Sequence, residues 1–420
     1  MKSIALKQEN EKQFQTRIDK FFKRYQIGEI VKKSNGYKER GFSVVELIRY
    51  LFCLVFRNRS MYQDMQTGKA PGFKKDTIYR LKNSIHINWN RFTTLLSARI
   101  IGETLRPLTA ENRRTAFIID DSIFERSGAT NVELLAKVYD HAKHRYTRGF
   151  RMLTLGWSDG VTMIPVNACL LSTEKAANRL CESVAVSPKS NGAKARELAV
   201  KKGTEAASEL VSNAIAAGIQ ANYVLFDSWF SSPKVICSMK EKGLDVVAMV
   251  KRSSKIHYRF QEKMLSCKDI FRQCRHRRGR SRYLLSVSVE ICVKGKDVAP
   301  IAAKLVFIRN RHDRNDYLVL LSTDTDLTED EIIQLYGKRW DIEVFFKTCK
   351  SVLKLTKECR SLSYDAMCAQ VAIVFMRYMF LAEGIRLDKD IRSAGPLFCL
   401  VADELEDISF LVAFEKLQLF

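Results

Sequence analysis

The chain has 420 residues, enough for two or three domains, and with 46% hydrophobic and 28% charged residues it is globular rather than disordered. Lys and Arg outnumber Asp and Glu by 70 to 47, so the formal net charge is +23. This excess attracts polyanions and predicts a nucleic acid or an anionic membrane surface as partner. A membrane is the weaker choice, because the most apolar runs, 44–56 and 367–382, contain charges and are too short to span one.

The N-terminus and the cysteines indicate the cellular compartment. The chain begins Met-Lys-Ser and continues with polar residues, without a signal-peptide core. Its 11 cysteines are scattered singly without a C-x-x-C pair, so neither a disulfide framework nor a structural zinc site is indicated. His141 and His144 have half of a zinc-ligand spacing, but no cysteine pair stands at a suitable distance. We expect a cytoplasmic protein, associated with the nucleoid if the cell is bacterial.

Residues 1–105 are predicted to form a helical, basic region. The pattern predicts an amphipathic helix over 42–56 and two further helices that begin near Asp76 and Asn88. With their lysines and arginines exposed, these two helices are compatible with a helix-turn-helix that binds DNA ends. A plain helical bundle with a charged surface is the alternative.

From residue 106 to 250 the pattern becomes that of an α/β core. An apolar strand over 115–119 ends in the adjacent acids Asp120 and Asp121. Further strands are expected over 150–157 and 162–171, and the three together predict an antiparallel meander.

The second part of this region alternates helices and strands. A basic segment over 187–203 is predicted to be a mobile loop, and a helix follows over 205–217. A strand over 223–226 ends in Asp227, and a helix over 233–242 and a strand over 246–250 follow. Three strands, a helix, a strand ending in an acid, a helix and a strand match a ribonuclease-H-like core with a mixed sheet.

Residues 251–326 depart from that core and are interpreted as a β-rich insertion. Strands are expected over 283–293, 302–309 and 317–323. One loop carries six arginines within eleven residues. Charge runs are usually only solvated, but arginines this dense favour contact with phosphates. The candidate contacts are Arg275, Arg277, Arg278 and Arg280.

The last two regions are predicted to be helical. Residues 327–385 complete the core, with a helix over 328–355 that begins at a capping box formed by Thr328 and Glu331. Residues 386–420 form a helical C-terminal region.

One helix carries the pattern Y-x2-R-x3-E-x6-K, formed by Tyr336, Arg339, Glu343 and Lys350. On a single α-helix these residues fall within an arc of about 60°, beside a separate apolar stripe. The ordinary interpretation is the solvated face of an amphipathic helix. The alternative is a site in which the acid holds a metal ion on a phosphodiester and the cations hold phosphates.

Three acids from distant positions fit such a site: Asp120, Asp227 and Glu343. In a ribonuclease-H-like fold the ends of the two strands and the late helix meet at one edge of the sheet. Mg²⁺ prefers oxygen ligands, and two divalent ions about 4 Å apart can cleave a phosphodiester. Asp121 remains an alternative first acid, because alternation along a strand sends adjacent residues to opposite faces.

These residues resemble those of a DDE-type bacterial insertion-sequence transposase, in the branch with a Tyr-Arg-Glu-Lys signature and a β-strand insertion. The resemblance covers roughly residues 113–355. It rests on the complete signature and on the segment 224–230, a strand followed by Asp-x-aromatic. The pattern Asp-x-Ser/Thr in that family favours Asp120, with Ser122 on its side, over Asp121.

The resemblance implies a cut-and-paste reaction on double-stranded DNA. Hydrolysis would free a 3′-OH at each transposon end, a hairpin would form and resolve there, and the 3′-OH would attack target DNA. The three acids would bind Mg²⁺, with Mn²⁺ as a substitute, and Tyr336, Arg339 and Lys350 would hold phosphates. The family works as a homodimer that brings two ends into a synaptic complex.

The resemblance leaves two alternatives open. An aromatic residue that holds a flipped base is expected in a hairpin step, and Trp229 is a candidate, although the sequence favours a core tryptophan at this position. A nuclease that cleaves without joining, or an inactive DNA-binding regulator derived from a transposase, is the alternative function.

Overall fold

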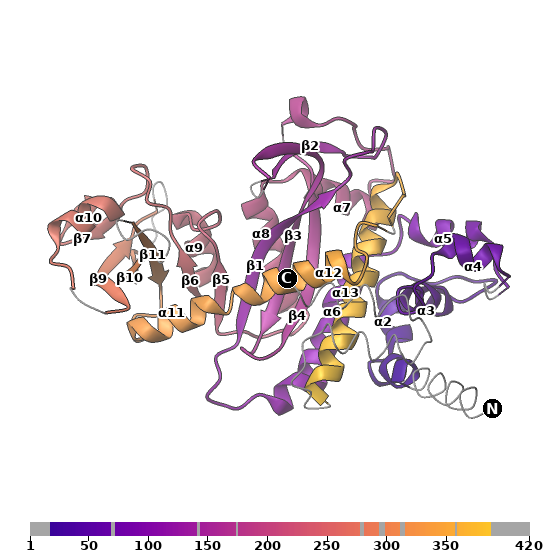
Figure 1. Ribbon diagram of the computed structural model, residues 1–420, viewed down its shortest axis with the longest axis horizontal. Coiled ribbons are helices and arrows are strands. Elements are labelled where there is room, and N and C mark those ends of the chain that lie inside the picture. The colour runs from indigo at the N-terminus through magenta and orange to yellow at the C-terminus, as the bar shows by residue number, and fades with distance from the viewer. Residues whose placement is uncertain are drawn as a thin grey trace.

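The computed structural model describes residues 17–68, 72–140, 143–173, 175–277, 281–293, 299–310, 316–357 and 359–387. Within these residues a mixed sheet of eleven strands runs through the molecule, in the order β2-β3-β1-β5-β6-β11-β10-β9-β7-β8, with β4 paired to β3 (Figure 1). The strands are β1 (Ala116–Glu125), β2 (Ala136–Asp140), β3 (Arg145–Ser158), β4 (Met163–Leu171), β5 (Tyr223–Phe226), β6 (Asp245–Met249), β7 (Tyr258–Phe260), β8 (Lys263–Leu265), β9 (Tyr283–Ile291), β10 (Ile301–Arg309) and β11 (Tyr317–Ser322).

Helices cover this sheet and form the N-terminal part of the described chain. They are α2 (Ile27–Lys33), α3 (Val44–Leu54), α4 (Met61–Gln66), α5 (Lys75–Lys82), α6 (Trp89–Ile100), α7 (Asn191–Val200), α8 (Gly203–Ala216), α9 (Pro233–Glu241), α10 (Cys267–Gln273), α11 (Glu329–Gly337), α12 (Trp340–Ser351) and α13 (Tyr364–Leu387). Short π or 3₁₀ turns, η1 (Ile101–Leu105), η2 (Arg106–Leu108) and η3 (Ala176–Asn178), complete the set.

The first part of the sheet has mixed strand directions around β1. Antiparallel pairs join β1 to β3 and β3 to β4, whereas β1, β5 and β6 pair in parallel. The central strand is buried because its first residues are apolar: Ala116, Phe117 and Ile118 are fully covered. This mixed α/β arrangement is consistent with a ribonuclease-H-like core, and the predicted meander of three strands is present.

The strands of residues 251–326 extend the same sheet. β11 pairs with β6 in antiparallel fashion, and β10 and β9 continue from it, followed by β7 and β8. The alternating pattern over 283–293, 302–309 and 317–323 predicted three of these strands to within two residues at each end. Their union with the core sheet was not predicted, because strand pairing is a long-range property.

The segment 187–203, which was predicted to be a mobile loop, is mostly helical. Ser190 caps α7 by accepting a hydrogen bond from the backbone N–H of Ala193. Arg196 then turns into the fold, where it donates to Glu133 and Asp365. The basic composition suggested exposure, but this arginine is 7% exposed.

The N-terminal helices follow the sequence with one shift. α3 lies within the predicted range and begins with a complete capping box of Ser43 and Glu46. Asn88 caps α6, as expected. α5, however, begins at Lys75 after Lys74, so Asp76 lies in its first turn and does not cap it. A DNA-reading role for these helices stays a prediction.

The helix α13 packs against both the N-terminal helices and the sheet. Among the described helices it is the one that is long and apolar enough to cross a membrane, so the expectation that this apolar run is too short is wrong. However, 83% of its most apolar window is buried in the fold. Arg377 in its middle is buried and donates to the backbone carbonyls of Leu51, Phe52 and Leu353. These contacts are those of a core helix. The predicted C-terminal region, 386–420, lies outside the described residues from 388 onward.

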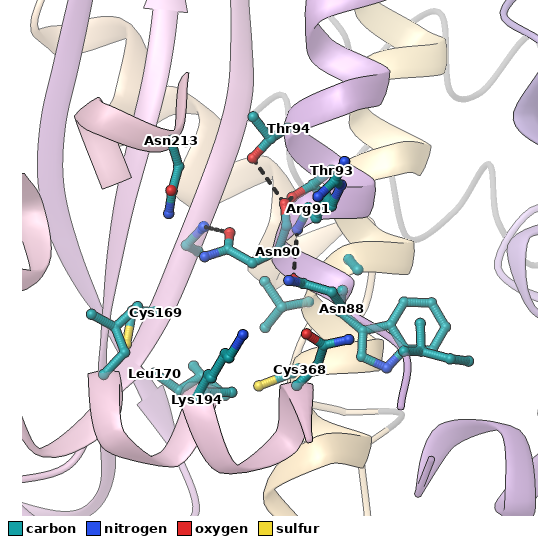
Figure 2. A pocket seen from close by; sticks show the side chains of 18 of the residues that line it. Asn88, Asn90, Arg91, Thr93, Thr94, Cys169, Leu170, Lys194, Asn213 and Cys368 are labelled. Carbon is teal, nitrogen blue, oxygen red and sulfur yellow. Dashed lines mark hydrogen bonds between the residues drawn. The ribbon is translucent and has the colours of Figure 1, made fainter. Parts of the chain in front are cut away.

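A cavity of about 410 Å³ lies between α6, α7, α8, α13 and β4 (Figure 2). Its wall includes the polar side chains of Asn88, Asn90 and Lys194. The two asparagines already accept hydrogen bonds, from the N–H groups of Arg91 and Ala168. None of the acids considered for catalysis lines this cavity.

Candidate active site

The two aspartates lie where β1 and β5 part. The parallel register of these strands ends with the pair Ile119 and Phe226, and Asp120 and Asp227 are the next residues along the chain. β5 stops there, whereas β1 continues to Glu125 because it remains paired with β3. The prediction that the first strand ends at Asp120 is therefore wrong. The prediction that the second acid follows its strand directly is confirmed.

Asp120 and Asp121 have different partners. Asp120 accepts a hydrogen bond from Nη1 of Arg339 at 2.5 Å. Asp121 instead forms an ion pair with Arg151 of β3. The pleat of the strand separates the two acids as alternation requires, and Ser122 shares the side of Asp120.

The predicted helix over 328–355 consists of two helices. α11 begins with the expected capping box of Thr328 and Glu331 and ends at Gly337, and α12 begins at Trp340. Gly337 favours this end because glycine is a poor helix former. The two helices follow one another across the sheet (Figure 1), and α11 contacts β6 and β11 while α12 contacts β1 and β4. The arc calculated for one straight helix does not apply across this break.

Arg339, in the junction, joins two of the acids. Its guanidinium donates to Asp120 at 2.5 Å and to Glu343 at 2.6 Å. The Tyr336 ring lies beside it, with 5.9 Å between the ring centre and the guanidinium carbon. Lys350 reaches back to β1 and donates to the hydroxyl of Ser122 at 2.6 Å. All four residues of the signature therefore lie on the side of β1 that carries Asp120.

At Asp120 and Asp227 the effect of burial on the pKa outweighs that of the neighbouring charges and hydrogen bonds. Burial raises the pKa of Asp120 to about 7, although the Arg339 guanidinium acts in the opposite direction. Burial also raises the pKa of Asp227, against hydrogen bonding from the Trp229 backbone and the charge of Arg339. Burial lowers the pKa of Lys350. An additional cation beside the acids would stabilise their ionised forms.

The donors at this site suit a hard divalent cation, since Asp120, Asp227 and Glu343 offer only carboxylate oxygens. In the arrangement seen here, however, no three His, Cys, Asp or Glu side chains of the described residues are grouped closely enough to hold an ion. The reason is visible in the contacts: the Arg339 guanidinium lies between Asp120 and Glu343. The chemistry of the three acids suits a metal, but two of them are paired with Arg339 in this structure.

Trp229 lies beside the acids and is not a core residue. Trp229 is 47% exposed, so the favoured interpretation of a core tryptophan is wrong. Lys251 and Arg151 lie 4.5 Å and 4.9 Å from its ring centre. Its backbone N–H donates to Asp227. No pattern in the sequence indicated these two cations, because they come from β3 and from the residues after β6.

The arginine-rich loop lies apart from the acids. Arg275 and Arg277 are exposed, and Arg277 covers the ring of Tyr283 at 4.3 Å, next to β9. The strands β5, β6, β11 and β10 separate β9 from β1 in the sheet. Arg278 and Arg280 lie outside the described residues.

Comparison with known protein families matches residues 39–301 to the DDE superfamily endonucleases, over more than half of the chain. The chain belongs to this superfamily. The matched segment includes Asp120 and Asp227 and ends before Glu343, so the role of Glu343 as the third acid stays a prediction. A search of curated proteins found no match. As a DDE superfamily endonuclease, the chain is expected to cleave DNA with divalent metal ions, typically Mg²⁺.

Proposed function

We propose that this DDE superfamily endonuclease is the transposase of an insertion sequence. It would bind terminal inverted repeats, cleave at the element ends with two divalent ions and join the 3′ ends to target DNA. The observation that carries the proposal is the contact of Arg339 with both Asp120 and Glu343, next to the point where Asp227 leaves its strand. This contact unites the acids with the cationic residues of the signature.

Asp120, Asp227 and Glu343 would hold Mg²⁺, or Mn²⁺ in its place. When bound, the ions would activate the attacking water or 3′-OH and stabilise the leaving oxygen. The residues of the chain position the DNA: Arg339 can grip a phosphate through two parallel hydrogen bonds, and Lys350 provides a point charge. Tyr336 packs beside Arg339 and would contribute its hydroxyl to the same phosphate contact.

Arg339 would then release the acids at the same time as it binds DNA. The guanidinium that pairs with the carboxylates in the free protein would turn to a phosphate of the transposon end. The acids would be free for the ions at the same time. This exchange would give Asp120 and Glu343 a cationic partner at both stages.

The protein would act as an assembly on bacterial DNA. A homodimer would bring two ends together in a synaptic complex, in the cytoplasm and next to the nucleoid of a bacterial cell. The net charge of +23 supports contacts with DNA well beyond one scissile phosphate.

The test is a strand-cleavage and joining assay. Purified protein is mixed with DNA that carries the inverted repeats flanking its own gene, with Mg²⁺ or with EDTA, and with a target plasmid. We expect nicking at the repeat ends and joining to the plasmid in Mg²⁺, and neither with Glu343→Gln or Asp120→Asn. Glu329→Gln, in the first turn of α11, is the control and keeps both activities.

Two other outcomes would overturn the proposal. Metal-dependent cleavage without joining would indicate a nuclease that lacks strand transfer. Binding to the repeats without cleavage in Mg²⁺ or Mn²⁺ would indicate an inactive DNA-binding regulator.

A further inference from the structure

The hairpin of β2 and β3 presents two tyrosines and two cations on one exposed face. In the antiparallel register, Lys137 lies opposite Arg148, and Tyr139 lies opposite Tyr146. Because side chains alternate along a strand, these four point to the same side, and all four are exposed. Ala136, Val138 and Asp140 of β2 are buried on the other side.

The cation pair is unfavourable in the protein alone. Like charges directly opposite each other on antiparallel strands destabilise the pair. Among the described residues neither Lys137 nor Arg148 forms an ion pair; Arg148 donates only to the neutral carbonyl of Ala129, at 3.2 Å. A polyanion bound across this face would turn the repulsion into attraction to both residues.

The tyrosines are placed to receive flat, apolar groups. Tyr146 is 70% exposed and Tyr139 37% exposed. Their ring centres are 5.2 Å apart with an angle of 69° between the planes, so the two rings meet edge to face. Aromatic rings flanked by cations form the platforms on which single-stranded nucleic acids stack their bases.

The β2–β3 hairpin lies next to the end of β1, the strand that carries Asp120. Gly149 of β3 pairs with Ala136 of β2 on one side and with Glu125, the last residue of β1, on the other. Glu125 is five residues from Asp120, about 17 Å along an extended strand. The charges of Asp140 and Glu125 act on Lys350, so the hairpin also adjoins the end of α12.

We propose that the stacking face, formed by Lys137, Tyr139, Tyr146 and Arg148, binds a single-stranded segment of DNA that extends from the candidate active site. Bases would stack on the tyrosine rings, and phosphates would lie against the two cations. A single strand fits better than a duplex, because the bases of a duplex are already stacked on one another. This inference rests on the proposed function only in taking DNA as the substrate.

The test measures DNA affinity in EDTA, so that no cleavage is needed. A fluorescent single-stranded oligonucleotide of mixed sequence and its duplex form are titrated with the full chain, and anisotropy is recorded. We expect Tyr146→Ala to weaken single-strand binding by about tenfold to a hundredfold, since stacking of one base contributes that much. Tyr146→Phe retains the ring and should stay within about twofold of wild type. Tyr62→Ala removes a tyrosine of equal exposure from α4 and is the matched control.

The salt dependence tests the cations separately. For a single strand, Lys137→Ala with Arg148→Ala should reduce the slope of log K against log salt by about 1.4 in magnitude, at about 0.7 for each phosphate that is no longer neutralised. Unchanged single-strand affinity in both tyrosine variants, Tyr139→Ala and Tyr146→Ala, would overturn the inference. Equal losses on duplex DNA would also overturn it and assign the face to duplex binding. Because these titrations need no catalysis, a chain that binds single strands here but neither cleaves nor joins would refute only the proposed function.

Discussion

Arg339 and Asp120 lie 219 positions apart in the chain, yet their side chains form an ion pair of 2.5 Å in which each is only 15% exposed. The same guanidinium holds Glu343 at 2.6 Å. One cationic side chain thus pairs with two of the three acids proposed to hold a metal ion. At the proposed metal site, Arg339 would compete with the metal for the same carboxylate oxygens.

Removal of Arg339 should strengthen metal binding in the absence of DNA. Arg339→Ala deletes two charge-assisted hydrogen bonds from Asp120 and Glu343, and we expect Mn²⁺ to bind about tenfold more tightly as a result. Isothermal titration or electron paramagnetic resonance of free Mn²⁺ measures this. Asp120→Asn in the same experiment should lose the binding. An Arg339→Ala protein that binds Mn²⁺ no better than wild type would show that the arginine does not shield the acids.

Lys350 should contribute to DNA binding through its position against β1. Its ammonium lies on Ser122, two residues from Asp120, whereas Lys347 on the same helix is exposed. Lys350→Met should weaken binding of the inverted repeat and reduce the slope of log K against log salt by about 0.9, the value for one duplex phosphate. Lys347→Met is the control. Equal effects of the two substitutions in a filter-binding titration would contradict a specific role for Lys350.

The buried ion cluster of α7 should be essential to stability. Arg196 contacts Glu133 at 2.6 and 2.9 Å and Asp365 at 2.6 Å, and the three side chains are 8% exposed or less. Arg196→Met would leave two acids buried without a cation and should lower the free energy of unfolding by about 3–5 kcal/mol. Urea denaturation followed by circular dichroism measures the change.

A surface arginine supplies the comparison for this cluster. Arg282 pairs with Asp330 at 3.3 Å and the two side chains are 70% and 56% exposed, so Arg282→Met should lower the free energy of unfolding by less than about 1 kcal/mol. If both substitutions lower the free energy of unfolding by the same amount, the cluster is no more stabilising than a surface ion pair.

The start of α11 predicts a dependence of stability on acid pH. Hydrogen bonds from the Thr328 backbone N–H and from Arg114 lower the pKa of Glu331 from 4.5 to about 2. Since the pKa is lower in the folded state, this contribution to stability is present above pH 4.5 and is lost as the pH falls toward 2. The melting temperature of wild type should exceed that of Glu331→Gln at about pH 7, and the difference should shrink between the two pKa values. A difference that is constant with pH would contradict the linkage.

Much of the fold could be predicted because its signals are local. The strand over 223–226 was predicted to the residue, since an apolar run this short, bounded by polar residues, suits a buried strand and is too short for a helix. The capping box at Thr328 was predicted for the same reason, because its hydrogen bonds close within four residues. The family resemblance added the convergence of the acids, which no local pattern contains.

The parts that could not be predicted depend on distant partners. β1 continues through Asp120 and Asp121 because β3 pairs with it, although acids are poor strand formers. The sequence predicted a loop at 191–200 because an arginine is usually exposed. The burial of Arg196 depends on its ion pairs with Glu133 and Asp365, which are distant in the sequence. The exposure of Trp229 likewise depends on the layout of the sheet and not on its neighbours in the chain.

The point at which β1 and β5 separate, after Ile119 and Phe226, limits which sequence changes related chains can accept. Exchanging one apolar residue for another before Asp120 alters packing, and neighbouring side chains can adapt. Adding or deleting a single residue there would reverse the pleat and place Asp121 or Ile119 against Arg339. In related chains, residue types in this stretch can therefore vary, but the spacing to the first acid should not. Changes of length belong in the β7–β8 hairpin, at the far edge of the sheet, where they leave the acids in register.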